Sequence, residues 1–163
     1  MATRLLPRSA ATASELPTDP QEVTEAFLAA LADKDVEMAN ALIDDDILYV
    51  NVGLPSVRGR QQMQRVFDLL ARPESAFEVY LHSISADGST VLTERTDVIV
   101  NRRLRAQFWV WGRFEVRDGR ITLWRDSFDF LDIARGTLRG VVSMLVPPLA
   151  AKAPASVEDP PGR

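Results

Sequence analysis

The segment TERTDVIV, residues 93–100, alternates like a half-buried β-strand, yet it places two ionisable side chains, Arg95 and Asp97, on one face. Side chains two positions apart in a strand point to the same side, so this pair shares its face with the apolar residues Val91 and Ile99. Charged groups are rarely buried without partners. We therefore expect the two side chains to pair with each other and with a further acidic group inside the fold.

Three further polar residues interrupt apolar strand patterns elsewhere in the chain. In LWRDSFDF, Asp126 shares a face with the aromatic residues Trp124 and Phe128. In DDILYVN, Tyr49 and Asn51 lie on one face of a predicted strand. Each of these residues taken alone could belong to a structural ion pair or to the wet side of a sheet. Taken together with the Arg-x-Asp pair, they indicate a polar site inside an apolar pocket.

An arginine between two carboxylates gives this set a definite chemistry. The planar guanidinium can hold Asp97 and Asp126 at the same time. Burial raises the pKa of a carboxylic acid and a neighbouring arginine lowers it, so two acids that share one arginine form a coupled pair able to hold one proton. One protonated acid beside one ionised base suits the addition of water across a strained ring, with Tyr49 and Asn51 holding the water. From the residues alone, the two aspartates are interchangeable.

Helices are predicted in the first half of the chain. Asp19 followed by Pro20 is typical of a helix N-terminus, and Glu22 lies three residues after this cap. A short helix is predicted at 36–42 and an amphipathic helix at 60–71. The apolar residues of the first and third helices have helical spacing, and they are Val23, Phe27, Ala30 and Leu31, then Met63, Val66, Phe67 and Leu70.

Strands dominate the second half. After an earlier strand at 45–51, the pattern predicts strands near 76–86, 89–101, 104–117 and 120–130, with Asp-Gly turns at 87–88 and 118–119. A closing helix is predicted from the spacing of Leu131, Ala134, Leu138, Val141 and Leu145. Helices followed by hairpin-linked strands predict an α+β domain with one mostly antiparallel sheet. If that sheet is strongly curved, with helices over its concave side, it forms a cone around one apolar pocket.

The predicted domain spans residues 19–146. The leader 1–18 and the Pro- and Ala-rich tail 147–163 are expected to be disordered. No apolar run is long enough for a membrane span.

Composition excludes several classes of function. The formal net charge of −4 argues against binding to nucleic acid or to an anionic membrane surface. The chain has no cysteine, which excludes disulfides, thiol nucleophiles and thiolate metal sites and fits the cytoplasm. His82 is the one histidine, so a histidine-based metal cluster is excluded as well. We expect neither a metal nor a cofactor.

Several segments taken together resemble the limonene-1,2-epoxide hydrolase family: LYVNVGLP with VRGR, TERTDV, and GRITLWRDSFD. The family pattern has a Tyr-x-Asn strand, an Arg-x-Asp strand and a later Trp-Arg-Asp strand ending in Phe-Asp. All five polar positions are present with the family's spacing, within residues 20–145. The resemblance implies an NTF2-like or cystatin-like cone, a homodimer, and one-step addition of water to an apolar epoxide to give a vicinal diol. It also implies that no metal, cofactor or covalent intermediate takes part.

By position, the resemblance assigns roles that the residues alone leave open. Asp126 would be the general base, Tyr49 and Asn51 would position the water, Asp97 would be the general acid on the epoxide oxygen, and Arg95 would orient both aspartates. The residues between the motifs follow no pattern that identifies one particular epoxide. Candidate lining residues, each of which could equally belong to a plain hydrophobic core, are Phe67, Leu70, Phe108, Val110, Phe114, Phe128, Leu138 and Met144.

Two other functions fit a similar cone. A ketosteroid-isomerase-like enzyme needs one carboxylate base and a neutral acid pair, which Tyr49, Asp97 and Asp126 could imitate. An arginine between the carboxylates would, however, stabilise charge where that chemistry needs a neutral acid. A non-catalytic module that binds an apolar ligand would need no paired acids. The paired acids therefore favour the hydrolase.

Overall fold

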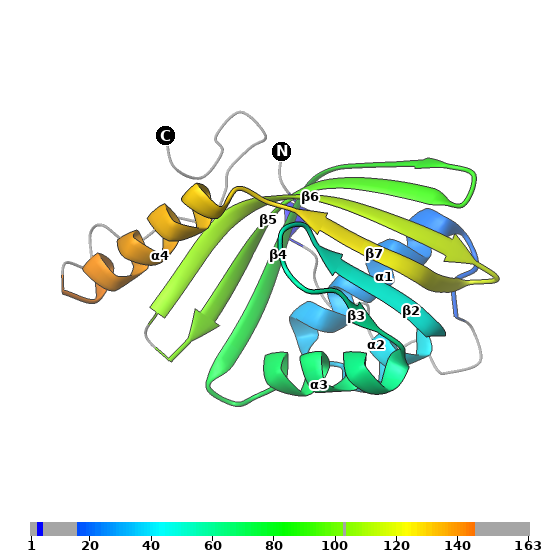
Figure 1. The fold of residues 1–163 in the computed structure, drawn as a ribbon, viewed down its shortest axis with the longest axis horizontal. Helices are drawn as coiled ribbons and strands as arrows, with labels where there is room; N and C mark the ends of the chain where they lie inside the picture. Colours follow the sequence, from blue (N-terminus) through cyan, green and yellow to red (C-terminus); the bar gives the residue numbers. More distant parts are fainter. Residues whose placement is uncertain (1–2, 5–15, 103, 146–163) are drawn as a thin grey trace.

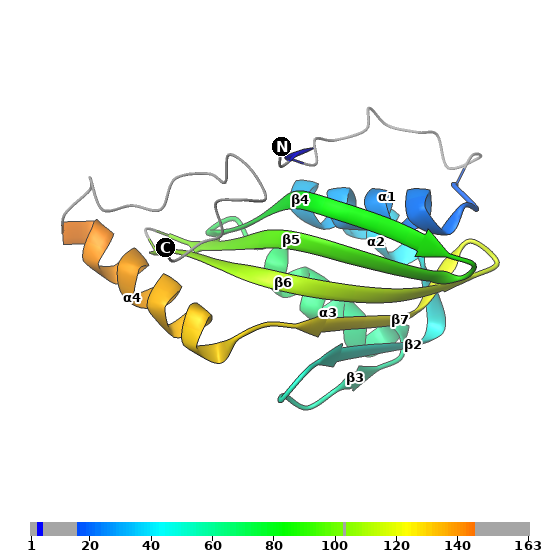
Figure 2. The same cartoon turned by 90° about the horizontal axis from the view of Figure 1, so that it is seen from above.

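The computed structural model describes residues 3–4, 16–102 and 104–145, which form four helices and one seven-stranded sheet. The helices are α1 (Pro20–Asp33), α2 (Val36–Ala41), α3 (Arg60–Leu70) and α4 (Phe130–Leu145). The strands are β1 (Thr3–Arg4), β2 (Ile43–Asn51), β3 (Val57–Arg58), β4 (Ser75–Asp87), β5 (Thr90–Asn101), β6 (Leu104–Arg117) and β7 (Arg120–Ser127). Figures 1 and 2 show α1 to α3 on one face of a curved sheet and α4 at one end of it. The predicted α+β class is confirmed.

Helix α1 begins where the sequence predicts. The Asp19 carboxylate accepts a hydrogen bond from the backbone N–H of Glu22 at 3.1 Å. Pro20 occupies the first helical position, where its missing N–H removes no helical hydrogen bond. The helix ends at Lys34, which adopts a left-handed backbone conformation with φ of 61° and donates its N–H to the last turn.

The sheet has the strand order β1-β4-β5-β6-β7-β2-β3, and every neighbouring pair is antiparallel except β2 with β7. The turn between β6 and β7 has Asp118 and Gly119 at positive φ, 49° and 71°, as a tight hairpin turn of this twist requires. The parallel pairing of β2 with β7 brings Asn51 directly opposite Asp126. Two polar strand ends far apart in the sequence therefore meet at one place in the sheet.

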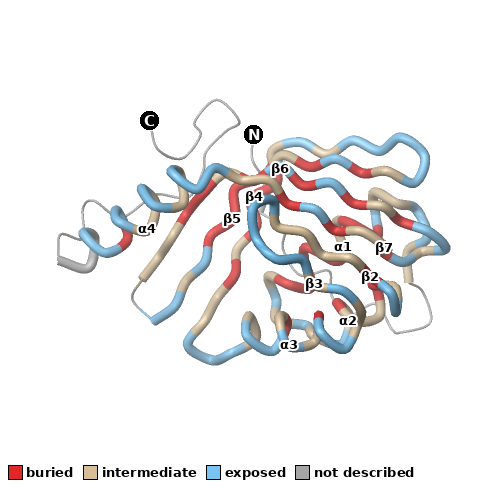
Figure 3. Tube along the Cα trace, in the orientation of Figure 1, coloured by how far each residue is buried: buried red, intermediate tan, exposed pale blue. Residues whose placement is uncertain are grey.

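The core lies between the inner face of the sheet and helices α1 to α3. The Phe27 ring of α1 lies edge-on to Phe67, Phe114 and Trp124, with centroid distances of 6.1, 6.4 and 5.1 Å. All four rings are at most 3% exposed. Figure 3 shows how buried and exposed positions alternate along the central strands, as expected for a sheet that carries its core on one face.

The chain leaves the sheet earlier than the sequence predicts. Strand β7 ends at Ser127 rather than at residue 130, and α4 starts at Phe130. The reason is a capping interaction, because the Asp129 carboxylate accepts a hydrogen bond from the backbone N–H of Leu131 at 2.7 Å. The prediction that this strand reaches residue 130 was therefore wrong, and Phe128, which was expected on the strand face of Asp126, follows the end of β7.

Helix α4 packs along β6 beyond the end of β7, where no described strand pairs with that side of β6. The Asp132 carboxylate accepts a hydrogen bond from the backbone N–H of Trp109 at 3.0 Å. Gly136 lies so close to β6 that an added Cβ would be 2.4 Å from the carbonyl oxygen of Gln107. Gly140 makes the same kind of approach one turn later. The two glycines therefore allow the helix to lie directly against strand backbone.

Parts of the predicted leader are held by the fold. Thr3–Arg4 pair with Leu81 and Tyr80 of β4, and Leu16 packs against the core. The rest of the leader, and the tail after residue 145, lie outside the described residues. Within the described part, none of the helices combines the length and apolarity needed to cross a membrane.

Candidate active site

The Arg-x-Asp pair of β5 lies inside the fold. Arg95 has no exposed surface and Asp97 is 4% exposed. The Arg95 Nε–H donates a hydrogen bond to Asp97 Oδ1 at 2.9 Å. Because successive side chains alternate between the faces of a strand, this contact fixes both groups on the inner face of the sheet.

Arg95 also reaches an acid on another strand. Its Nη2 donates to Oδ2 of Asp126 at 2.6 Å, and Asp126, in β7, is itself 4% exposed. The other oxygen of this carboxylate, Oδ1, is buried and has no hydrogen-bond partner among the described residues. A buried carboxylate oxygen without a donor is costly, so a water or a ligand group is expected there.

Tyr49 and Asn51 lie beside Asp126 because β2 runs parallel to β7. The Tyr49 hydroxyl donates to Asn51 Oδ1 at 3.1 Å. The Tyr49 ring stacks on Trp124, with ring centroids 4.1 Å apart. Asn51 is paired directly with Asp126 in the sheet. The hydroxyl therefore fixes the amide oxygen of Asn51 and leaves its NH2 group available to donate.

Two rows of opposed residues cross β5, β6, β7 and β2 on the inner face. One row is aromatic apart from its first member and consists of Val91, Phe114, Trp124 and Tyr49. The other row is polar apart from Gly112 and consists of Thr93, Gly112, Asp126 and Asn51. The polar row thus lies directly beside an aromatic layer of the inner face.

The charges perturb one another strongly. Burial raises the pKa of Asp97 to about 6 against the opposing effect of Arg95, and the charge of Asp126 adds to the rise. Burial by itself lowers the pKa of Arg95, but Asp126 and Asp97 together outweigh it, so the guanidinium stays charged. Burial, followed by the charge of Asp126, raises the pKa of Tyr49 well above its usual range. Tyr49 is therefore a neutral hydrogen-bond donor, and Asp97 can hold a proton up to mildly acidic pH.

A cavity of about 330 Å³ opens beside these groups. Its walls are mostly apolar, and it is of a size that takes a small ligand. Four of the five predicted catalytic residues border it, and Arg95 lies behind them. The lining residues are Tyr49, Asn51, Val66, Leu70, Phe77, Asp97, Ile99, Ala106, Phe108, Val110, Trp124, Asp126, Phe128, Ile133 and Thr137.

The eight predicted lining residues differ in where the structure places them. Leu70, Phe108, Val110 and Phe128 border the cavity. Phe67 and Phe114 do not, because they are buried in the aromatic core around Phe27. Leu138 does not either, because it lies on the outer side of α4 with 64% of its surface exposed. The side chain of Met144 lies outside the described residues.

Sequence reasoning missed several residues of the cavity wall. Ala106 could have been found, since it lies two residues before Phe108 on the same strand face. Ile133 and Thr137 are one turn apart on α4, but the predicted closing helix gave no sign of which face meets the cavity. Trp124 was named only as a neighbour of Asp126, yet it lines the cavity and its buried indole N–H has no partner among the described residues.

The residues that the structure describes offer no grouping of three His, Cys, Asp or Glu side chains that could hold a metal ion. The polar groups of the site are two carboxylates, one guanidinium, one phenol and one amide. Groups of this kind can bind a water, move protons and stabilise charge.

The curved sheet with its helices is an NTF2-like α+β fold, since an NTF2-like protein from Cytophaga hutchinsonii ATCC 33406 matches with a TM-score of 0.59 over 72% of this chain and 95% of that chain, at 14% identity. A putative ketosteroid isomerase from Kribbella flavida DSM 17836 shares this fold, with a TM-score of 0.57 over 68% of this chain and 77% of that chain. The identity is 17%, so this likeness concerns the fold alone.

The sequence comparisons identify the family. The model of the limonene-1,2-epoxide hydrolase catalytic domain matches residues 18–139. Epoxide hydrolase EphG of Mycobacterium tuberculosis is 51% identical over 129 residues, which cover 78% of this chain and 85% of that protein. The structure of an LEH-like epoxide hydrolase from M. tuberculosis matches with a TM-score of 0.80 at 46% identity, over 83% of this chain and 96% of that chain. The chain belongs to the limonene-1,2-epoxide hydrolase family, and epoxide hydrolase is its enzyme class.

Proposed function

We propose that this chain adds water to an apolar epoxide in one step, giving a vicinal diol by general acid–base catalysis without a covalent intermediate. The observation that carries this proposal is the position of Arg95, which bridges Asp97 and Asp126 beside an apolar cavity. One-step hydrolysis needs a proton donor and a proton acceptor at the same time. Two acids that share one cation can supply both, because one can stay protonated while the other is ionised.

Asp126 is the general base in this proposal. Its buried Oδ1 lacks a partner among the described groups and can accept a hydrogen bond from water. Asn51 lies opposite it in the sheet, and the amide orientation that Tyr49 fixes leaves an NH2 group to hold the same water. As the water attacks one carbon of the epoxide, its proton passes to Asp126.

Asp97 is the general acid. Burial keeps its pKa near 6, so in weakly acidic solution it holds the proton that the opening ring requires. The C–O bond of the epoxide breaks as the oxygen takes this proton, and no alkoxide needs to accumulate. Arg95 stays charged throughout and stabilises the two carboxylates as their protonation states exchange.

A single turnover in water enriched in oxygen-18 tests this proposal. With enzyme in excess over the epoxide, the diol should carry one labelled oxygen and the protein none, as judged by mass spectrometry of the diol and of intact enzyme. A nucleophilic aspartate would form an ester, and its hydrolysis would leave label in the carboxylate. Label in the peptide that contains Asp97 or Asp126 would contradict the one-step mechanism.

The cavity supports a substrate that is mainly hydrocarbon. Its wall is apolar apart from the catalytic groups and Thr137, and its volume is about 330 Å³. A panel of epoxides of increasing hydrocarbon size should show a maximum in kcat/KM at a body that fills this volume. Steadily increasing activity toward small, polar epoxides would contradict an apolar substrate.

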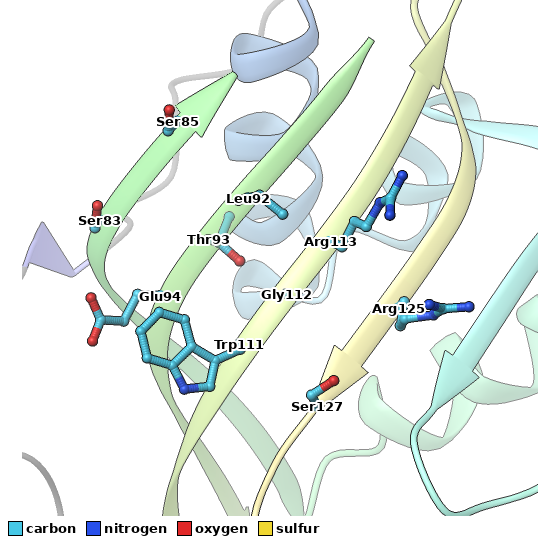
Figure 4. Close-up of a pocket in the computed structure, with 10 residues that line it drawn as sticks. All are labelled: Ser83, Ser85, Leu92, Thr93, Glu94, Trp111, Gly112, Arg113, Arg125 and Ser127. Atoms are coloured by element: carbon cyan, nitrogen blue, oxygen red, sulfur yellow. The ribbon is translucent and has the colours of Figure 1, made fainter. Parts of the chain in front are cut away.

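We also propose that the enzyme is a homodimer that pairs through the outer face of its sheet. This face has a hollow of about 340 Å³ on the side opposite the core. Figure 4 shows Leu92 of β5 and Trp111 of β6 beside Arg113 and Arg125. Leu92 is 54% and Trp111 57% exposed, and Glu94 lies in the same patch. Apolar groups with charges of both signs suit a self-complementary contact across a two-fold axis.

The cytoplasm remains our prediction for the location of the enzyme. It rests on the absence of cysteine, which fits a reducing compartment. Fractionation of cells that produce the tagged full-length chain would test it.

A further inference from the structure

The guanidinium of Arg95 has to cross a neighbouring strand to reach Asp126. Arg95 is in β5 and Asp126 in β7, and β6 lies between them in the sheet. The β6 residue directly opposite Asp126 is Gly112. A Cβ added to Gly112 would be 2.2 Å from Nη1 of Arg95, so the guanidinium occupies the space that any other side chain would need.

Thr93 borders the same space on the other side. It is the β5 residue directly opposite Gly112, and a Cβ on Gly112 would also be 2.4 Å from its Oγ1. The Nη1 of Arg95 donates to this hydroxyl oxygen at 3.1 Å, and Thr93 is 2% exposed. Figure 4 shows Thr93 and Gly112 next to each other on adjacent strands. Neither residue borders the catalytic cavity.

Each nitrogen of the guanidinium therefore has a partner of its own. Nε is bound to Asp97, Nη2 to Asp126 and Nη1 to Thr93. The ring of Phe114 lies beneath, with its centroid 5.9 Å from Cζ of Arg95. A planar group held at three nitrogens and against one ring cannot rotate or slide toward one acid without breaking a buried hydrogen bond.

We propose that Thr93 and Gly112 form a socket that positions Arg95 so that it engages both aspartates at once. They are positioning residues for the hydrolysis proposed above, on which this inference rests, and they do not touch the substrate. Gly112 provides the passage across β6, and the Thr93 hydroxyl fixes the rotation of the guanidinium within it. Without the socket, Arg95 pairs with only one of the two aspartates and leaves the other without a cationic partner.

A purely structural role for Thr93 predicts different behaviour. A buried threonine that only fills space can be replaced by valine, which has nearly the same shape, without any effect on the acids. A threonine that holds Arg95 changes the titration of Asp97 when its hydroxyl is lost. The charged or titratable groups that face Asp97 are Arg95, Asp126 and Tyr49, whereas its sheet neighbours Val79 and Phe108 are apolar.

The decisive variant is Thr93→Val, with Thr93→Ser as the rescue and Thr96→Val as the matched control. Thr96 is a fully buried threonine of the same strand, and its hydroxyl bonds His82 rather than Arg95. Thr93→Val should lower kcat about tenfold, the effect of one hydrogen bond to a charged group, and leave KM unchanged. Thr93→Ser should restore kcat, and Thr96→Val should keep it.

The second measurement does not depend on activity. Carbon-13 NMR of the Asp97 carboxyl should show its pKa higher in Thr93→Val than in wild type, because a loosened Arg95 stabilises the carboxylate less. The pKa should return in Thr93→Ser and stay unchanged in Thr96→Val. Gly112→Ala should give the larger effect, with kcat lowered at least as far as by Thr93→Val. If Gly112→Ala fails to fold, Thr93→Val decides.

The two readouts separate this inference from the proposed function. An altered Asp97 titration in Thr93→Val, in a protein that hydrolyses none of the epoxides of the panel, supports the socket and overturns the proposed function. Wild-type kcat and wild-type titration in Thr93→Val, in an active enzyme, overturn the socket alone. A lowered kcat that Thr93→Ser does not restore, with the titration unchanged, also overturns it.

Discussion

At the scale of single residues, the site depends on charges that are buried inside the fold. Arg95 is fully buried, and two buried carboxylates lie at its nitrogens. Burying any one of these groups alone would be strongly unfavourable. Burying them together lets the guanidinium bind both carboxylates, and among the described residues Oδ1 of Asp126 is a fully buried atom of this set that keeps no hydrogen-bond partner, in a residue that lines the cavity. This unpartnered oxygen is therefore a position where a water can be bound and activated.

Replacement of the base tests this arrangement directly. Asp126→Asn should lower kcat by roughly 10² to 10⁴, the usual contribution of general-base catalysis, because an amide cannot accept the proton of the attacking water. Steady-state rates on the best epoxide give the result. Asp87→Asn, at an exposed position at the end of β4, should behave as wild type. A residual kcat above about a tenth of wild type would assign the base to another residue.

The raised pKa of Asp97 sets the pH dependence. A general acid must be protonated, so kcat/KM should be high below about pH 6 and fall as the pH rises through this value. This fall in rate is the alkaline limb of the pH profile. Asp97→Asn, which cannot titrate, should lose this limb along with most of its activity. Rates measured from pH 4.5 to 9 decide, and a wild-type profile flat across pH 6 would contradict Asp97 as the acid.

At the scale of elements, much of the arrangement could be predicted because local signals agreed with the tertiary fold. The cap at Asp19 and the Arg-x-Asp alternation in β5 led directly to α1 and to the buried pair. The boundary between β7 and α4 was predicted wrongly, because residues 128–130, Phe-Asp-Phe, fit strand alternation as well as a helix cap. Spacing also cannot tell which apolar helix positions face solvent, as Leu138 illustrates.

The role of Gly112 lay beyond the reach of sequence reasoning altogether. A glycine in a strand indicates that something approaches closely, but the identity of that group depends on strand register. Here the register places Gly112 between Thr93 and Asp126, and a long side chain from β5 crosses above it. Only the three-dimensional arrangement identifies this side chain as that of Arg95.

The close contact between α4 and β6 leads to a prediction for Gly136. Gly136→Ala should be destabilising by about 1 to 3 kcal/mol, because the new Cβ would meet the carbonyl oxygen of Gln107 at 2.4 Å. This direction is opposite to that expected for alanine in an exposed helix, where it is the better helix former. Thermal unfolding gives the result, with the exposed Arg135→Ala of the same helix as control. A melting temperature at or above that of wild type would mean that α4 does not lie in close contact with the backbone of β6.

At the scale of the whole molecule, the curved sheet separates two tasks. Its inner face carries the core, the buried charges and the cavity, whereas its outer face carries the apolar patch around Trp111. Alternation along each strand makes this separation possible, because neighbouring residues point to opposite sides. Trp111 and Gly112 are such neighbours: the Trp111 side chain lies on the proposed dimer surface, whereas Gly112, which borders the outer hollow as well, leaves its inner side to Arg95.

The proposed dimer can be tested through this patch. Sedimentation of the wild-type chain should give twice the mass of one chain. Trp111→Arg should shift the mass toward that of a single chain, because it removes apolar contact area and adds like charges close to the two-fold axis. Leu69→Arg, on the exposed side of α3, is the matched control and should leave the mass unchanged. A Trp111→Arg protein that stays dimeric would place the interface elsewhere.

The position of α4 has a consequence for any attempt to enlarge the cavity. Ile133 and Thr137 form part of the cavity wall, and the same helix covers the backbone of β6 that has no described strand beside it. Uncovered strand edges recruit other chains and lead to aggregation. A variant that loosens α4 to admit a bulkier epoxide will therefore also expose the unpaired edge of β6, which other chains can bind. Wider substrate scope obtained on this side of the cavity should come with lower solubility, whereas changes at Val66 or Leu70 of α3 leave that edge protected.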